Sequence, residues 1–294
     1  VIFIAQGDEF RKKDDRNYII AGRDKRTYEQ LFRSIGADHK AITTVAFLWA
    51  YDDPAYIEDY RSIVYVLQAM ASERVPAERL VLGAPFKTDL ERCYLESWSG
   101  LERSVGPLVS KTRVKAVIQE AEPFHDSGIT EQASDWLWRE MGAIGKVHSA
   151  LYQAGKRYEL TINEVAAATG EPPFKTRGTY LITGGLGKLG LICARHLAQT
   201  YKARLILSGS SPLDVEKQLQ IKDIETLGGR VVYIHADLCD KDRLRKGLEA
   251  AKGQFGDIQG IIHAAGRVDP QVIYHKPVDS FEKVIDPKIK VPLR

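Results

Sequence analysis

The chain has 294 residues and a formal net charge of +3, and 44% of its residues are hydrophobic and 28% charged. This length allows two domains with substantial cores, and the composition is that of an ordinary soluble protein. The weak charge and the lack of a basic stripe interleaved with aromatic residues argue against nucleic-acid binding. We therefore interpret the basic clusters at 11–13 and 243–246 as solvated surfaces.

The cysteines and the apolar runs bear on the cellular compartment of the protein and on whether it binds a metal or a membrane. Cys93, Cys193 and Cys239 lie far apart and match no disulfide or metal-binding spacing, so we expect a cytoplasmic protein without a metal site. The longest apolar run, at 41–51, is too short to cross a membrane, which predicts that the chain has no membrane partner. The chain begins at Val1 with no charged leader and no methionine, which favours an excised piece of a longer protein without a signal peptide.

The first half alternates predicted strands and helices. After Pro54, apolar residues recur at steps of three and four up to Met70, which predicts an amphipathic helix. The first strand is followed by Gly7 and the acidic pair Asp8 and Glu9, which would repel a pyrophosphate, so this half is predicted to be structural. Strands are expected at 1–5, 18–21, 41–49, 79–82, 115–118, 146–151 and 156–160, and helices at 28–35, 54–70, 90–105 and 132–141.

A connector separates the two halves. Residues 166–177 include Gly170, Pro172 and Pro173 and have low propensity for regular structure. We therefore expect one domain at 1–165 and a second at 178–294, each with its own α/β sheet.

The second half opens with a strand, a glycine turn and a helix. Residues 179–182 are predicted to form a buried strand, and Leu189, Ile192, Ala194 and Leu197 recur at helical spacing. The intervening glycines at 185, 187 and 190 have the spacing of the dinucleotide-binding fingerprint in its required context. The alternative is an ordinary glycine-rich loop.

Further strands are expected at 204–208, 230–235 and 260–263, and helices at 215–227 and 241–252. Strands that alternate with helices predict right-handed crossovers and a parallel sheet. The predicted fold class is α/β, with two Rossmann-like subdomains of which the second is a truncated, doubly wound parallel sheet.

Three segments of the second half together resemble the short-chain dehydrogenase/reductase superfamily: Thr183-Gly-Gly-Leu-Gly-Lys-Leu-Gly190, Ala236-Asp-Leu238 and His263-Ala-Ala-Gly266. An α/β half without a phosphate loop precedes them, and Asp286-Pro-Lys-Ile289 follows. This arrangement resembles the ketoreductase domain of a modular polyketide synthase, in which a structural subdomain precedes the catalytic one. The similarity covers almost the whole chain.

The resemblance implies NADPH as the cofactor and assigns roles to matched residues. Asp237 would accept a hydrogen bond from the adenine amino group, although it could instead cap the helix that follows. The small residues at 264–266 would pass close to the ribose, although a crowded sheet edge could need them without a cofactor. The implied cofactor-binding residues are Thr183, Gly184, Gly185, Leu186, Gly187, Lys188, Leu189, Gly190, Ser208, Gly209, Ser210, Asp237, Leu238, His263, Ala264, Ala265 and Gly266.

The resemblance also implies one catalytic residue. Lys288 matches the family's active-site lysine, whose charge lowers the pKa of a neighbouring tyrosine and orients the nicotinamide ribose. Without the resemblance Lys288 is one of many exposed lysines. The family's serine and tyrosine are expected after Lys288, beyond Arg294.

Two positions depart from the family pattern. Relatives that prefer NADPH usually carry an arginine where this chain has Ser210, and a hydroxyl cannot neutralise a 2′-phosphate. Lys188 could supply the missing charge, so we expect a weakened NADPH preference that rests mainly on Lys188. Val268-Asp269-Pro270 stands where one stereochemical class has Leu-Asp-Asp, so that fingerprint is broken.

The implied function is the reduction by NADPH of the β-keto group of an acyl chain tethered through phosphopantetheine to an acyl carrier protein, beside neighbouring synthase domains. One alternative is a non-reducing structural module, which the missing arginine and truncated sheet favour. The other is a free-standing dehydrogenase of small alcohols, against which the glycine-poor first half argues.

Overall fold

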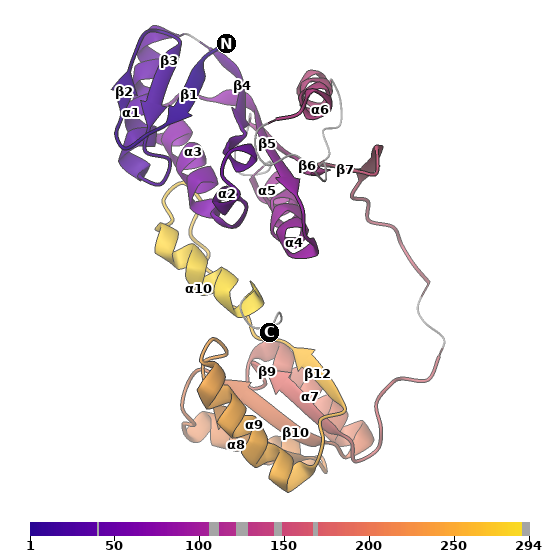
Figure 1. The fold of residues 1–294 in the computed structure, drawn as a ribbon. Coiled ribbons are helices and arrows are strands. Elements are labelled where there is room, and N and C mark those ends of the chain that lie inside the picture. Colours follow the sequence, from indigo (N-terminus) through magenta and orange to yellow (C-terminus); the bar gives the residue numbers. More distant parts are fainter. Residues whose placement is uncertain (40, 106–111, 122–128, 144–148, 167–169, 290–294) are drawn as a thin grey trace. The chain divides into compact units, whose positions relative to one another are not determined.

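The computed structural model describes residues 1–39, 41–105, 112–121, 129–143, 149–166 and 170–289. It divides into two compact units, of which the first comprises Val1–Val165 and Val272–His275 and the second Ala166–Gln271 and Lys276–Arg294. Both units combine parallel strands with helices, which confirms the predicted α/β class (Figure 1). Within the described residues no helix has the length and hydrophobicity needed to span a membrane.

The first unit holds two sheets, so the prediction of a single sheet for this half is wrong. Its short first strands pair only among themselves, in the order β1-β3-β2, and β2 is antiparallel to β3. The later strands form a second sheet in the order β4-β5-β6-β7-β8, parallel except for β8. The strands are β1 Phe3–Gln6, β2 Arg11–Lys12, β3 Asn17–Ile20, β4 Ile42–Phe47, β5 Ala77–Phe86, β6 Arg113–Glu120, β7 Ala150–Gln153 and β8 Lys156–Glu159.

Helices cover both faces of the second of these sheets. Leu80 and Leu82 of β5 point into the main core, whereas Val81 packs in a smaller core with Leu137 of α6. Burial on both faces explains why β5 reads as a nearly continuous apolar run. The helices are α1 Lys25–Asp38, α2 Ala55–Glu58, α3 Tyr60–Ser72, α4 Asp89–Ser97, α5 Ser99–Val105 and α6 Glu131–Gly142, with a short 3-10 helix at Trp49–Tyr51.

The helix predicted from Pro54 to Met70 is interrupted at Asp59. Asp59 adopts a non-helical conformation, and its carboxylate accepts a hydrogen bond from the backbone N–H of Arg61, so it caps α3 instead of continuing α2. The strand predicted at 146–151 begins at Ala150 in the structure, and 144–148 lie outside the described residues.

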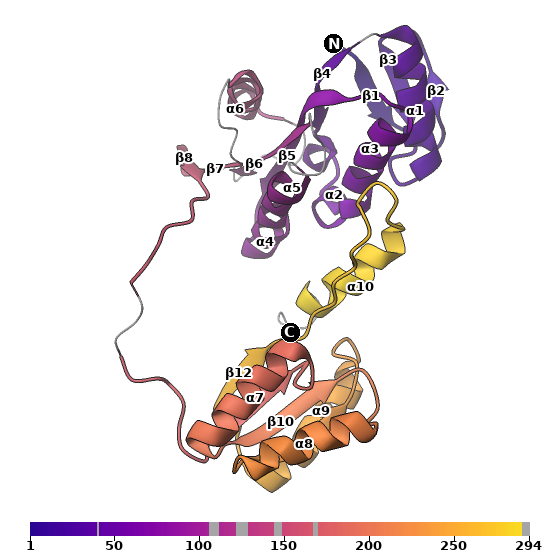
Figure 2. The same cartoon turned by 180° about the vertical axis from the view of Figure 1, so that it is seen from behind.

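The second unit is one parallel sheet in the order β11-β10-β9-β12, which confirms the four predicted strands. Figures 1 and 2 show α7 and α8 on one face of this sheet and α9 on the other. The elements are β9 Thr179–Thr183, α7 Lys188–Tyr201, β10 Arg204–Gly209, α8 Val215–Thr226, β11 Arg230–His235, α9 Lys241–Phe255, β12 Gly260–His263 and α10 Val278–Ile289.

Helix α7 forms as predicted, but only two of the four residues that indicated it, Ala194 and Leu197, are buried. Leu189 and Ile192 are 68% and 64% exposed, whereas Gly190, Ala194 and Leu197 are buried against the sheet. Small residues on the buried face let the helix pack closely on β9 and β10.

Candidate cofactor site

The carboxyl ends of the strands in the second unit lie in one row. Thr183 of β9 pairs with Ser208 of β10 and with His263 of β12. β10 and β11 lie on one side of β9 and β12 on the other, so the strand order reverses at β9. Open parallel sheets bind ligands outside the carboxyl ends at such a reversal. The structure therefore brings the three strand ends expected to bind the cofactor to the place where this fold class binds ligands.

The turn between β9 and α7 has no room for added side chains at two of its glycines. Gly184 has a φ of +64°, and a Cβ there would lie 2.8 Å from the Cα of Ala265. A Cβ on Gly190 would lie 2.7 Å from the Cα of Gly185 and would overlap the carbonyl oxygen of Gly184. Backbone contacts thus account for these glycines.

The start of α7 leaves backbone donors open. Its N-cap is Gly187, which has no side chain to accept a hydrogen bond, and the first bond of the helix runs from the N–H of Leu191 to the carbonyl of Gly187 at 2.8 Å. The N–H groups of residues 188–190 therefore have no acceptor within the helix. Open N–H groups and the positive end of the helix dipole favour an anion. Leu186 lies half-buried within the turn that leads to them.

Hydrogen bonds join the end of β12 to the end of β9. The hydroxyl oxygen of Thr183 lies 2.7 Å from Nδ1 of His263, and the Thr183 carbonyl accepts a hydrogen bond of 3.1 Å from the N–H of Ala264. The backbone of Ala265 lies so close to Gly184 that a Cβ on Gly184 would collide with it. Gly266 is exposed, and no such crowding explains it.

The end of β10 carries a buried polar atom without a partner. Ser208 is fully buried, and its Oγ has no hydrogen-bond partner among the described residues. The Ser208 carbonyl accepts a hydrogen bond of 3.2 Å from the N–H of Gly185, which holds the glycine turn against β10. Next along the chain, a Cβ on Gly209 would lie 2.6 Å from the hydroxyl of Tyr233, and Ser210 is exposed.

The turn after β11 presents an exposed carboxylate. Oδ1 of Asp237 accepts a hydrogen bond of 2.9 Å from the N–H of Cys239, and Leu238 is buried. The N-cap of α9 is Asp240, whose Oδ1 accepts from the N–H of Arg243. The alternative reading of Asp237 as the helix cap is therefore wrong.

The two lysines singled out by sequence lie beside different strand ends, Lys188 after β9 and Lys288 near Gly266, which follows β12. Lys188 is the first residue of α7 and is exposed. Lys288 is exposed on α10, and its Cε lies 4.0 Å from the position that a Cβ on Gly266 would take. Among the described residues neither lysine has a carboxylate within ion-pair distance.

Sequence reasoning missed two residues near Ser210. Nε2 of His235 lies 3.3 Å from the Ser210 carbonyl oxygen, and Nη2 of Arg243 lies 3.2 Å from Nδ1 of His235. Their positions in the sequence could have indicated them, because His235 is the last residue of a strand and Arg243 lies in the first turn of the helix that follows.

The corresponding strand ends of the first unit are occupied by side chains. Tyr56 donates a hydrogen bond of 3.1 Å to Oε1 of Gln6 at the end of β1. Arg23, after β3, lies over the Tyr56 ring and 3.3 Å from Asp59. The pocket there is lined by three acidic residues, Asp8, Asp24 and Asp53, as well as by Arg23.

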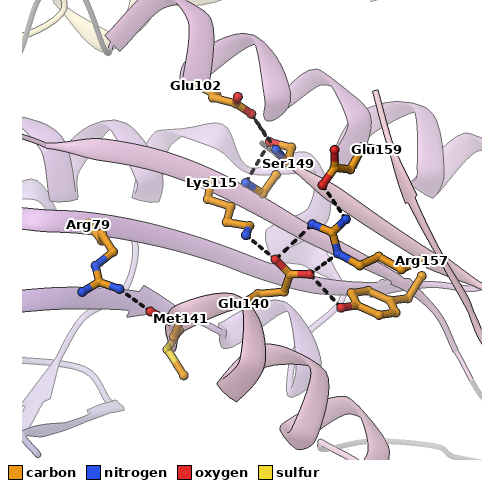
Figure 3. Close-up of polar contacts among 10 residues, drawn as sticks. Arg79, Glu102, Lys115, Glu140, Met141, Ser149, Arg157 and Glu159 are labelled. Carbon is orange, nitrogen blue, oxygen red and sulfur yellow. Dashed lines mark hydrogen bonds and ion pairs between the residues drawn. The ribbon is translucent and has the colours of Figure 1, made fainter. Parts of the chain in front are cut away.

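The first unit also buries a cluster of charges (Figure 3). The carboxylate of Glu140 on α6 pairs with Lys115 of β6 and with Arg157 of β8, whose Nε lies 2.5 Å away, and it accepts a hydrogen bond of 2.7 Å from Tyr152. Burial raises the pKa of Glu140, but the hydrogen bonds from Arg157, Lys115 and Tyr152 outweigh burial and lower that pKa to about 2. Both carboxylate oxygens have partners, so this cluster holds elements together. Within the described parts of the chain no three His, Cys, Asp or Glu side chains are placed to hold a metal ion.

Known proteins match both units. The model of the KR domain family matches residues 178–292. Polyketide synthase PksM of Bacillus subtilis is 38% identical over 289 residues, a match that covers 98% of this chain but only 7% of that protein.

Two solved structures share the fold. An N-terminal ketoreductase from the macrolactin assembly line has a TM-score of 0.73 and 21% identity, covering 97% of this chain and 59% of that one. A ketoreductase domain from the bacillaene assembly line has a TM-score of 0.66 and 24% identity, covering 93% of this chain and 58% of that one. The chain thus belongs to the ketoreductase domains of polyketide synthases.

Proposed function

We propose that this chain forms the cofactor-binding part of a ketoreductase that uses NADPH to reduce the β-keto group of an acyl chain carried by an acyl carrier protein. The observation that carries the proposal is the glycine turn at the strand-order reversal, with the open N–H groups of residues 188–190. These donors suit a pyrophosphate. The unpartnered hydroxyl of Ser208 offers a further buried polar contact at the same sheet edge.

Each strand end has a role in this proposal. The turn at 184–190 would hold the pyrophosphate, Asp237 the adenine amino group, and residues 264–266 the ribose. When bound, NADPH supplies the hydride. Lys288, beside Gly266, would orient the nicotinamide ribose and lower the pKa of the active-site tyrosine, so that this tyrosine can donate a proton to the carbonyl oxygen.

The chain spans only 7% of the length of the synthase PksM, so the whole protein's partners belong to the proposal. They are an acyl carrier protein with a phosphopantetheine arm and the neighbouring domains of a cytoplasmic synthase.

The test is turnover by the intact protein with NADPH and a β-ketoacyl thioester of pantetheine. We expect NADPH absorbance to fall as the β-hydroxy thioester forms, and Lys288→Ala to reduce turnover at least about 100-fold. Lys283→Ala is the matched control, because Lys283 is also an exposed lysine of α10. The parent protein's failure to bind NADPH would favour a structural module, and equal turnover of small free ketones would favour a free-standing dehydrogenase.

A further inference from the structure

Two side chains from β11 form hydrogen bonds with backbone carbonyls of the loop that follows β10. The hydroxyl of Tyr233 donates a hydrogen bond of 2.6 Å to the carbonyl of Ser211. Two residues further along β11, Nε2 of His235 lies 3.3 Å from the carbonyl oxygen of Ser210. The loop beside Ser210 is therefore held in place by β11.

Arg243 fixes the tautomer of His235. A guanidinium can only donate hydrogen bonds, so the contact of 3.2 Å between Nη2 of Arg243 and Nδ1 of His235 makes Nδ1 the acceptor. In the neutral ring the proton then lies on Nε2, which donates to the Ser210 carbonyl. One chain of hydrogen bonds thus runs from Arg243 through His235 to Ser210.

The charge of Arg243 is not neutralised within this cluster. Oδ1 of Asp240 accepts the backbone N–H of Arg243, and Asp242 lies 3.7 Å from Arg245. Asp237 accepts the N–H of Cys239. Among the described residues no carboxylate lies within ion-pair distance of the Arg243 guanidinium. It therefore keeps most of its donors for a ligand.

We propose that Arg243, oriented by His235, recognises the 2′-phosphate of NADPH and supplies the guanidinium that Ser210 does not. This inference rests on the proposed function, because it assumes that a dinucleotide lies along the strand ends. Arg243 lies on α9 and contacts Ser210 only indirectly, because His235 at the end of β11 lies between them. Lys188 lies at the start of α7, which follows β9 on the other side of β10. Arg243 acts on cofactor choice, and His235 is its positioning residue.

The experiment measures dissociation constants by calorimetry on the intact protein. The ligands are NADPH, NADH and adenosine 2′,5′-bisphosphate. We expect Arg243→Ala to weaken NADPH and the bisphosphate by about 10- to 100-fold, as for the loss of a charged hydrogen bond, and to leave NADH unchanged. Arg243→Lys should keep part of the preference. Arg245→Ala is the matched control, since Arg245 is an exposed arginine in the same region of α9, and it should change neither affinity.

His235→Ala should lower the ratio of NADPH to NADH affinity without changing the NADH affinity or the melting temperature. A purely structural role would change NADH affinity as well. If Arg243→Ala keeps the parent's preference for NADPH over NADH while Lys188→Ala abolishes this preference, Arg243 has no part in recognition of the 2′-phosphate and the proposal is overturned. If the parent binds neither dinucleotide, the proposed function fails first and the inference fails with it.

Discussion

The Glu140 charge cluster of the first unit and the candidate cofactor site of the second differ in whether their polar groups have partners. In the first, the buried carboxylate of Glu140 is matched by Lys115, Arg157 and Tyr152. In the second, the N–H groups of residues 188–190 lack acceptors within α7, and the buried Oγ of Ser208 has no partner among the described residues. Satisfied polar groups stabilise a fold, whereas preorganised unsatisfied ones are available to a ligand. Parallel strands and helices occur in both units, so the glycine turn makes the difference.

The largest effect expected is the loss of the glycine turn. Gly190→Ala would place a Cβ 2.7 Å from the Cα of Gly185, so the turn must shift away from its present position. We expect NADPH affinity to fall at least about 100-fold, because several backbone hydrogen bonds of about 1 kcal/mol each would be lost. Gly253→Ala is the control: this helical glycine has open space around it, and alanine there should leave affinity unchanged. Equal affinity in both variants would contradict the assignment of the turn.

The charge cluster of the first unit is tested by stability. Glu140→Gln would leave Lys115 buried without a counter-charge, and we expect the free energy of unfolding to fall by about 3 to 5 kcal/mol. Glu159→Gln removes the more exposed partner of the same arginine, Arg157, and should cost under about 1 kcal/mol. Denaturant unfolding of the two variants measures the difference. Similar losses in both would show that burial does not set the strength of this cluster.

The Glu140 carboxylate also makes the stability of the fold depend on pH. Its pKa is about 2 in the folded protein against an ordinary 4.5, a difference that corresponds to about 3 kcal/mol. Because the folded pKa is depressed, this contribution is fully present above about pH 4.5 and is lost as the pH falls toward 2. Glu140→Gln should therefore remove this component from the pH profile of unfolding. An unchanged profile between pH 5 and 2 would reject the role of the ion pairs.

The smallest effect expected is at the end of β10. Ser208→Ala removes an unpartnered buried hydroxyl, so stability should stay equal or rise by about 1 kcal/mol, while NADPH affinity falls a few-fold. Thr183→Val removes a hydroxyl that does have partners, His263 and Ala265, and should lower stability by about 1 kcal/mol. Thermal unfolding compares the two variants, and a stability loss for Ser208→Ala would mean that its hydroxyl serves the fold.

Local patterns predicted much of the second unit. The strand, glycine turn and helix at 179–201 follow from residues adjacent in sequence, and the structure has them in the expected order. The burial of α7 did not follow, because hydrophobicity alone favours Leu189 and Ile192 over the small residues that permit close packing.

Contacts between distant residues were beyond prediction. The cluster of Glu140 joins residues from 115 to 157, and its pairing depends on how α6 lies across the sheet. The basic neighbours of Arg243 indicate a solvated surface, whereas its contact with His235 depends on how α9 lies against β11. Asp59 interrupts a helix that periodicity alone would continue.

The central claim is that only the second unit binds the dinucleotide, and hydrogen exchange of the intact protein with and without saturating NADPH tests it most directly. We predict slower amide exchange in peptides that cover residues 183–190, which include the open backbone donors of α7, and 208–211, at the end of β10, and unchanged exchange at 3–8 and 20–25. Protection at 3–8 and 20–25 without protection at 183–190 would contradict the account.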